Sequence, residues 1–85
     1  AGAEVVVGDR PDPRVLDLLG DALLARRRVT FRYRSMERDA EETRTVEPWG
    51  LFFLAGRWYL AARDPSRGEG RAGLRNFRVS RVVDA

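Results

Sequence analysis

The chain has 85 residues with no cysteine and no histidine, and it carries a net charge of +3. This length fits one small domain, whose core is near the lower practical limit for stability. The missing cysteines exclude disulfides and thiolate metal sites, and the missing histidines remove the commonest metal ligand, so we expect no metal and no cofactor. No apolar run approaches the roughly 20 residues of a membrane span. We expect a cytoplasmic fragment of a longer soluble protein, with no membrane partner.

All sixteen basic residues are arginine, and their distribution is uneven. Residues 57–81 hold seven arginines against two acidic residues, a balance of +5, whereas the remainder holds nine against eleven, a balance of −2. A basic C-terminal third on a mildly acidic remainder predicts one positive face, which favours an anionic partner.

The N-terminal part predicts one helix. Residues 1–11 contain a short β-prone run and form either a linker or an extra edge strand, and residues 12–85 form the domain. Asp12 and Pro13 are typical of an N-cap and a first helical position. Apolar residues then recur at spacings of three and four, which predicts an amphipathic helix over about 13–27. Arginines 26–28 fall in its last turn, where cations suit the helix dipole, and we interpret them as a helix end.

A change of period marks the first strands. From Val29 the apolar period becomes two, with Phe31 and Tyr33 turned inward, which predicts a half-buried strand. The polar, acidic stretch 35–42 predicts a loop. A second strand over 43–47 ends before residue 48, a proline, because proline cannot donate to a ladder.

The most hydrophobic part of the chain predicts a β-hairpin at the centre of the core. Its strands are 51–54 and 57–63, and a two-residue turn joins them, with Gly56 free to adopt positive φ. We expect Trp58 and Leu60 to be buried and leave Tyr59 unassigned. A loop over 64–73 and a strand over about 74–79 follow, with two further valines at 82–83. A helix and about five short antiparallel strands predict a small barrel.

Motifs that suggest catalysis fail on their context. G-x-G-x-x-G occurs at 68–73, but no helical period follows it, and 85 residues cannot supply a dinucleotide fold. Glu41 and Glu42 fall in the predicted solvated loop, and no serine has a histidine to activate it. We therefore expect that the protein is not an enzyme.

The strongest candidate site is the basic strand near the C-terminus. Period two places Arg75 and Arg81 on the side of Phe77, and Arg78 on the opposite side, if the strand is flat. Guanidinium groups are planar forks of donors that hold phosphates in a bidentate manner. The alternative interpretation is a plain strand whose arginines decorate the surface.

Four segments resemble one family. Trp58-Tyr59-Leu60 is the triplet that names the WYL domain, and residues 46–51 resemble its Val-x-Pro-aromatic-Gly-Leu segment. Residues 31–35 resemble its first-strand tyrosine region, and 75–82 resemble its Arg-x-Phe-Arg-x-x-Arg-Ile element. These motifs stand in the family's order at fitting separations, and the similarity runs from about residue 16 to residue 82.

The resemblance implies an Sm-like (SH3-type) barrel that forms the sensing part of bacterial transcription regulators, with a helix-turn-helix domain elsewhere in the full-length chain. It implies a non-catalytic role and a ligand that is single-stranded nucleic acid or a nucleotide. By position, Arg75, Arg78 and Arg81 correspond to the basic ligand site, and Tyr33 and Ser35 border it.

One position departs from the family pattern, and one other function stays open. An acidic residue is common where Ser80 stands, so a partner that orients a neighbouring arginine is missing. The alternative function is a protein-interaction or dimerisation module without a nucleic-acid ligand, because small barrels of this kind pair through strand edges, which makes a homodimer a possible partner.

Overall fold

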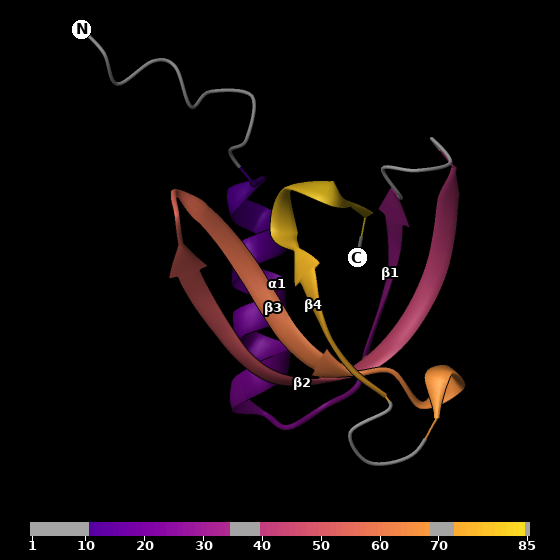
Figure 1. Ribbon diagram of the computed structural model, residues 1–85. Coiled ribbons are helices and arrows are strands. Elements are labelled where there is room, and N and C mark those ends of the chain that lie inside the picture. Colours follow the sequence, from indigo (N-terminus) through magenta and orange to yellow (C-terminus); the bar gives the residue numbers. More distant parts are fainter. Residues whose placement is uncertain (1–10, 35–39, 69–72, 85) are drawn as a thin grey trace, which may run out of the picture.

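The computed structural model describes residues 11–34, 40–68 and 73–84. It is mainly β, with five antiparallel strands preceded by a helix (Figure 1). The elements are α1 (Pro13–Leu24), β1 (Val29–Arg34), β2 (Glu41–Leu54), β3 (Arg57–Arg63), η2 (Pro65–Arg67), β4 (Leu74–Arg78), η4 (Val79–Arg81) and β5 (Val82–Asp84). The predicted linker or edge strand over 1–11 lies almost wholly outside the described residues, and the division of the chain at residue 12 stays a prediction.

The helix begins where the sequence predicts and ends sooner. The Asp12 side chain accepts a hydrogen bond from the Arg14 N–H at 2.9 Å, as an N-cap does. The helix stops at Leu24, because Arg26 adopts φ of 55° and the N–H of Arg27 turns back to the Ala22 carbonyl at 2.9 Å. The predicted placement of arginines 26–28 in the last helical turn is therefore wrong: Arg26 is the left-handed residue just after the helix, and the other two follow it.

Strand β2 replaces three predicted segments. The expected loop over 35–42 is wrong from residue 41 onward, because a strand begins there. The expected break at Pro48 is also wrong, because the same strand runs through Glu41–Leu54. Its first part pairs with β1 up to Val46, and its second part pairs with β3. Pro48 lies beyond the β1 ladder and beside a register shift before Gly50, where a sheet tolerates proline.

Because β2 exchanges one partner for another along its length, the sheet curls, and its strand order is β4-β3-β2-β1-β5. Strands β4 and β5 are the two edges. No ladder joins these edges within the described residues, so the sheet is open and the predicted closure into a barrel is not shown. One hydrogen bond spans the gap, from the Arg78 N–H to the Tyr33 hydroxyl at 3.0 Å.

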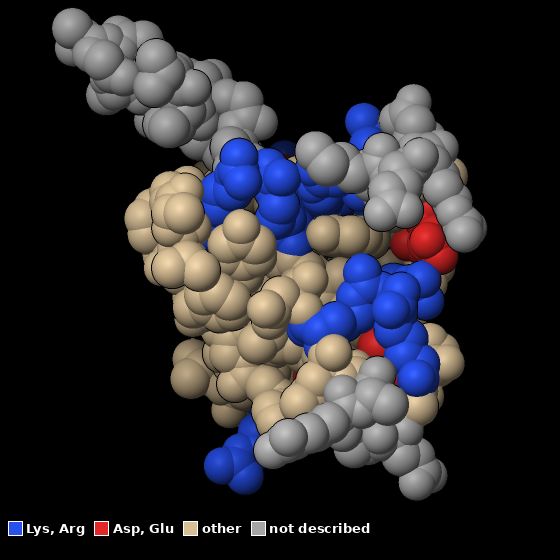
Figure 2. Space-filling view, in the orientation of Figure 1, with Lys and Arg blue, Asp and Glu red and all other residues tan. Residues whose placement is uncertain are grey.

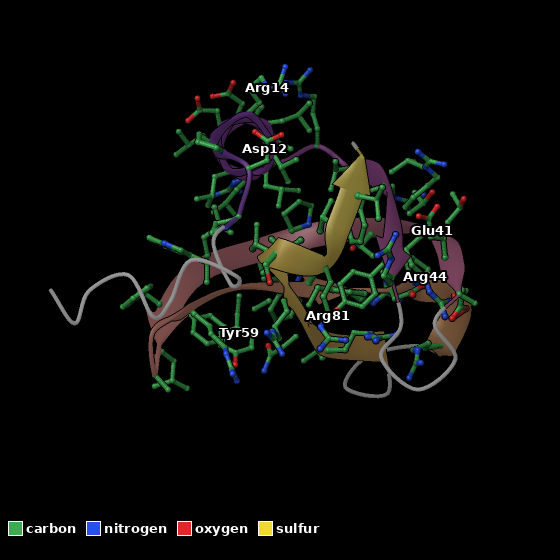
Figure 3. The ribbon with its side chains drawn as sticks, turned by 90° about the horizontal axis from the view of Figure 1, so that it is seen from above. Asp12, Arg14, Glu41, Arg44, Tyr59 and Arg81 are labelled. Carbon is green, nitrogen blue, oxygen red and sulfur yellow. The ribbon has the colours of Figure 1, made fainter. Side chains whose placement is uncertain are left out.

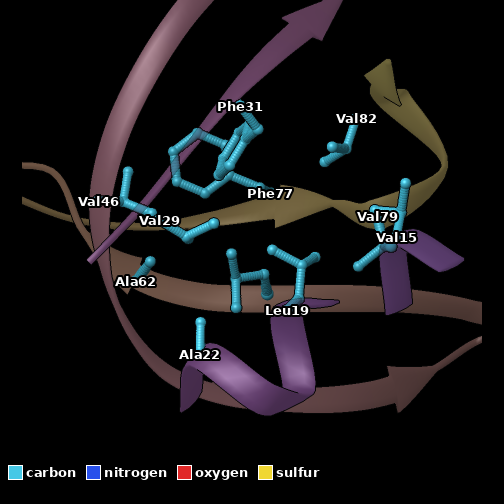
Figure 4. Close-up of a cluster of buried hydrophobic side chains, with 11 residues drawn as sticks. Val15, Leu19, Ala22, Val29, Phe31, Val46, Ala62, Phe77, Val79 and Val82 are labelled. Carbon is cyan, nitrogen blue, oxygen red and sulfur yellow. The ribbon is translucent and has the colours of Figure 1, made fainter. Parts of the chain in front are cut away.

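The core lies between α1 and the inner face of the curled sheet, which is the face that carries Phe31 and Val46 (Figure 4). Every element except η2 contributes to it. Its buried side chains are Val15, Leu19, Ala22, Val29, Phe31, Val46, Leu60, Ala62, Phe77, Val79 and Val82.

The predicted two-residue turn of the hairpin is confirmed. The prediction that the hairpin is the centre of the core is wrong. Ala55 and Gly56 both have positive φ, at 52° and 80°, as a two-residue hairpin turn requires. Leu60 is fully buried as predicted, but Trp58 is only partly buried. Phe53, which packs edge-on against Trp58, is 60% exposed, because the tip extends past the residues that cover the core.

Candidate ligand-binding site

The basic C-terminal strand is shorter than predicted. β4 ends at Arg78, and the turn η4 carries Val79–Arg81 before β5 begins. Arg81 therefore does not follow the alternation of a flat strand. Figure 3 shows Arg81 and Tyr59 on the side of the sheet that faces away from α1.

Arg75 lies on the inner face, at the rim of the core. Its guanidinium carbon stands 4.4 Å from the ring centroid of Phe77, a cation–π contact. Its cross-strand partner on β3 is Ala62, a buried small residue that leaves room for the long side chain. The prediction that Arg75 and Phe77 share a side is confirmed.

Tyr33 connects the first strand to this region. Its ring packs edge-on against Phe31 and Phe77, with centroids 6.1 and 5.1 Å away. Its hydroxyl accepts the hydrogen bond from the Arg78 main chain. Tyr33 therefore positions β4 through its backbone, besides lying close to the Arg75 side chain.

Arg78 has Tyr59 as its cross-strand partner, so its side chain belongs to the opposite face from that of Arg75. The Tyr59 ring stacks on Phe52, with centroids 5.2 Å apart and planes inclined by 17°. Ser35, the fifth predicted site residue, lies outside the described residues.

The structure adds Arg44 to this region, a residue that the motif search missed. Arg44 is the partner of Phe31 in the β1–β2 register, so it points to the inner face, and its side chain is only 20% exposed. It contacts Glu42 at 2.7 Å and the buried carboxylate of Asp64 at 3.6 Å. The signal was available in the sequence, because period two from Val46 places residue 44 on the buried side.

The structure also adds Arg67, which lies in η2, to the region of the candidate site. Arg67 and Arg44 are both close enough to Arg75 to act on its charge. Burial lowers the pKa of the Arg75 guanidinium, and the like charges of Arg67 and Arg44 lower it further, while Asp64 opposes them. Arg44 of β2 and Arg75 of β4 therefore act on the carboxylate of Asp64, and Arg67 of η2 acts on Arg75.

Ion pairing divides the arginines into two sets. Those on the β1–β2 side contact carboxylates, as in Arg28–Glu47 at 3.0 Å and Arg34–Glu41 at 3.4 Å. In the part of the chain that the structure describes, an ion pair is absent for Arg26, Arg27, Arg67, Arg75 and Arg81. The first two of these are exposed just after α1, whereas the last three belong to the loop and tail. Figure 2 shows most of the basic side chains of the face away from α1 gathered at its upper centre and at its right, with others at the lower left and upper right.

Other kinds of site find no support in the described ranges. Residues 11–34, 40–68 and 73–84 contain no helix long and apolar enough to cross a membrane. The same ranges hold no group of acidic side chains arranged to bind a metal ion.

A family model, that of the WYL domain, matches residues 14–85. The chain therefore belongs to the WYL domain family, which confirms the resemblance predicted from its motifs. Its relatives include Protein PafB of Mycobacterium tuberculosis and of Mycobacterium bovis, each 39% identical over 82 residues, which is 96% of this chain and 24% of the relative. Protein PafB of Mycobacterium leprae is 36% identical over 67 residues, covering 79% of this chain and 19% of the relative.

A solved structure agrees with these relatives. The proteasome accessory factor B/C (PafBC) of Arthrobacter aurescens has a TM-score of 0.72 and 32% identity, covering 89% of this chain and 12% of that one. The chain thus spans about a quarter of the length of the curated relatives that it matches.

Proposed function

We propose that this WYL domain is the non-catalytic ligand-sensing part of a bacterial transcription regulator and that it binds single-stranded nucleic acid or a nucleotide. The proposal includes a helix-turn-helix domain elsewhere in the full-length chain, a cytoplasmic location and an Sm-like (SH3-type) relationship of the curled sheet. The observation that carries it is the set of loop and tail arginines that form no ion pair within the described residues, Arg67, Arg75 and Arg81.

Aromatic side chains beside these arginines favour a single strand over a duplex. Proteins that bind single strands combine a basic surface, which follows the phosphates, with rings on which bases stack. Here the stacked pair Phe52 and Tyr59 is half-buried and lies beside Arg78 in the sheet, and Tyr33 is half-buried near Arg75. A duplex keeps its bases stacked inside, so these rings would contribute nothing to its binding.

Fluorescence anisotropy of labelled oligonucleotides tests this function. The domain is titrated against single strands, duplexes of the same sequence and small cyclic oligonucleotides at constant salt concentration. We expect saturable binding of a single-stranded or cyclic species and weaker binding of the duplex. Equal affinity for duplex and single strand, or no binding of any species, would contradict the proposal.

Exposed edges and apolar residues favour a second candidate, a dimerisation module. Strands β4 and β5 are both open edges, and Phe53 and Leu54 at the hairpin tip are each 60% exposed. Sedimentation at low micromolar concentration, with and without oligonucleotide, separates the two functions. A dimer that is indifferent to nucleic acid would favour this candidate.

A further inference from the structure

The geometry points to an anion subsite within the proposed ligand site, in which Arg44 joins Arg67 and Arg75 and the buried carboxylate of Asp64 acts as a built-in counter-ion that limits affinity for phosphate. None of Arg44, Arg67 and Asp64 belongs to the tail motif. The inference rests on the proposed function, because it assigns this cluster to a phosphate of the same ligand.

Arg67 lies in a turn whose base is held by main-chain hydrogen bonds. The Asp64 N–H donates to the Gly73 carbonyl at 2.7 Å, which joins the two ends of the loop, and the Arg67 N–H donates to the Asp64 carbonyl at 3.0 Å. A Cβ at Gly73 would lie 2.7 Å from the carbonyl oxygen of Gly68, so only glycine fits at this junction. The turn that carries Arg67 is thus fixed at its base.

Arg44 and Arg75 are held before any ligand arrives. Arg44 is restrained by Glu42 and Asp64, and Arg75 lies over the buried Phe77 ring. A guanidinium that is already oriented loses less side-chain entropy when it binds phosphate. The cluster is therefore suited to receive an anion with little rearrangement.

One carboxylate oxygen of Asp64 accepts hydrogen bonds, and the other accepts none from the described residues. Its Oδ1 accepts from the N–H and hydroxyl of Ser66, at 3.0 and 2.6 Å. Its Oδ2 is buried and accepts no hydrogen bond from the described residues, although Arg44 Nη1 lies 3.6 Å away. The side chain is 2% exposed. A buried carboxylate with a free oxygen beside Arg44 and Arg75 lowers the positive potential of the site without fully pairing either of them.

The test compares two substitutions of the same kind, Asp64→Asn and Asp12→Asn. Both residues cap a helical turn by accepting a main-chain hydrogen bond, which asparagine retains, but Asp12 is on α1, away from Arg44 (Figure 3). The probe is a labelled ten-residue oligo-dT strand. Because a charge a few ångströms from a phosphate is removed, Asp64→Asn should tighten binding by about threefold or more, whereas Asp12→Asn should change it much less.

Arg67→Ala provides a second variant that does not disturb the core, with Arg27→Ala as its matched exposed control. Arg67→Ala should weaken binding several-fold more than Arg27→Ala does. If the parent binds the strand but Asp64→Asn equals Asp12→Asn, this inference is wrong, and the observed binding leaves the proposed function standing. Equal effects of Arg67→Ala and Arg27→Ala would in addition remove Arg67 from the arginines that carry the proposed function.

Inorganic pyrophosphate tests the opposite case, in which the anion site exists but the domain binds no oligonucleotide. Its binding is followed through the arginine Nε–H resonances of the parent domain. Pyrophosphate that shifts Arg44, Arg67 and Arg75, in a domain that ignores oligonucleotides, would support the anion site and overturn the proposed function. No shift of these resonances, together with no oligonucleotide binding, would overturn both.

Discussion

The arginines that face acidic residues of β2 differ from those of the loop and tail in what stands opposite them. Arg34 faces Glu41, and Arg63 faces Glu47, as direct partners in the sheet. The register therefore neutralises these charges, and such exposed pairs contribute only about 0–1 kcal/mol each.

The tail strand has no carboxylate in register. Opposite Arg75 stands Ala62, and opposite Arg78 stands Tyr59. The same residue type thus meets two different surroundings in one small sheet, and the difference is made by its cross-strand neighbours. Composition alone cannot reveal this difference, because it gives the number of charges and not their cross-strand partners.

The largest effect expected is on stability, from the core residue over which Arg75 packs. Phe77 is fully buried and contacts Phe31, Tyr33 and Arg75, so Phe77→Ala should lower the free energy of unfolding by about 3–5 kcal/mol. A small domain has roughly that much stability to lose, so the variant should be largely unfolded by circular dichroism.

The matched control for this truncation is Phe53→Ala at the exposed hairpin tip, which should melt close to the parent. Trp58 is only partly buried, so its truncation should cost less than the full amount expected for a core aromatic residue. A cooperative melt of Phe77→Ala near that of the parent would show that the tail strand is not seated on the core.

A smaller effect is expected from the hydrogen bond between the two regions. Tyr33→Phe keeps the ring contacts but leaves the Arg78 N–H without its acceptor, which should cost about 1 kcal/mol. Urea unfolding measures this difference. Tyr59→Phe is the control, because the Tyr59 hydroxyl makes no hydrogen bond within the described residues, and an equal loss in both variants would contradict the bridging role of Tyr33.

The smallest effect concerns pH. Burial alone would raise the pKa of the Asp64 carboxyl, but hydrogen bonds from Ser66 and the charges of Arg44 and Arg75 outweigh it and lower the pKa. A lowered pKa stabilises the folded state above about pH 4, and this contribution is lost as the pH falls through the folded value. The urea midpoint of the parent should therefore fall more steeply on acidification than that of Asp64→Asn. Parallel pH curves would contradict the assignment.

Much of the fold could be predicted from local patterns. The N-cap at Asp12, the alternation after Val29 and the turn at Gly56 are each decided by a few neighbouring residues, and each prediction is confirmed. The continuity of β2 could not be predicted, because the proline rule assumes a partner on both sides of Pro48, and the partner changes there.

The candidate site was harder to predict because it depends on long-range pairing. The motif indicated Arg75 through its neighbours in one strand. Arg44 and Arg67 reach the same place from β2 and η2, and only the curl of the sheet and the closed loop bring them there. The burial of Asp64 had no signal in the sequence, since an acidic residue before a proline is typical of an exposed turn.

The salt dependence of single-strand binding tests the distinction between paired and unpaired arginines most directly. One variant replaces Arg67, Arg75 and Arg81 with alanine, and the other replaces Arg28, Arg32 and Arg34, so both lose the same formal charge. Each lost phosphate contact should flatten the plot of log affinity against log salt by about 0.7, so the first variant should flatten it by about 2 and the second should leave it nearly unchanged. Equal flattening in the two variants would contradict the account, because it would mean that binding depends on total charge and not on which arginines lack a carboxylate.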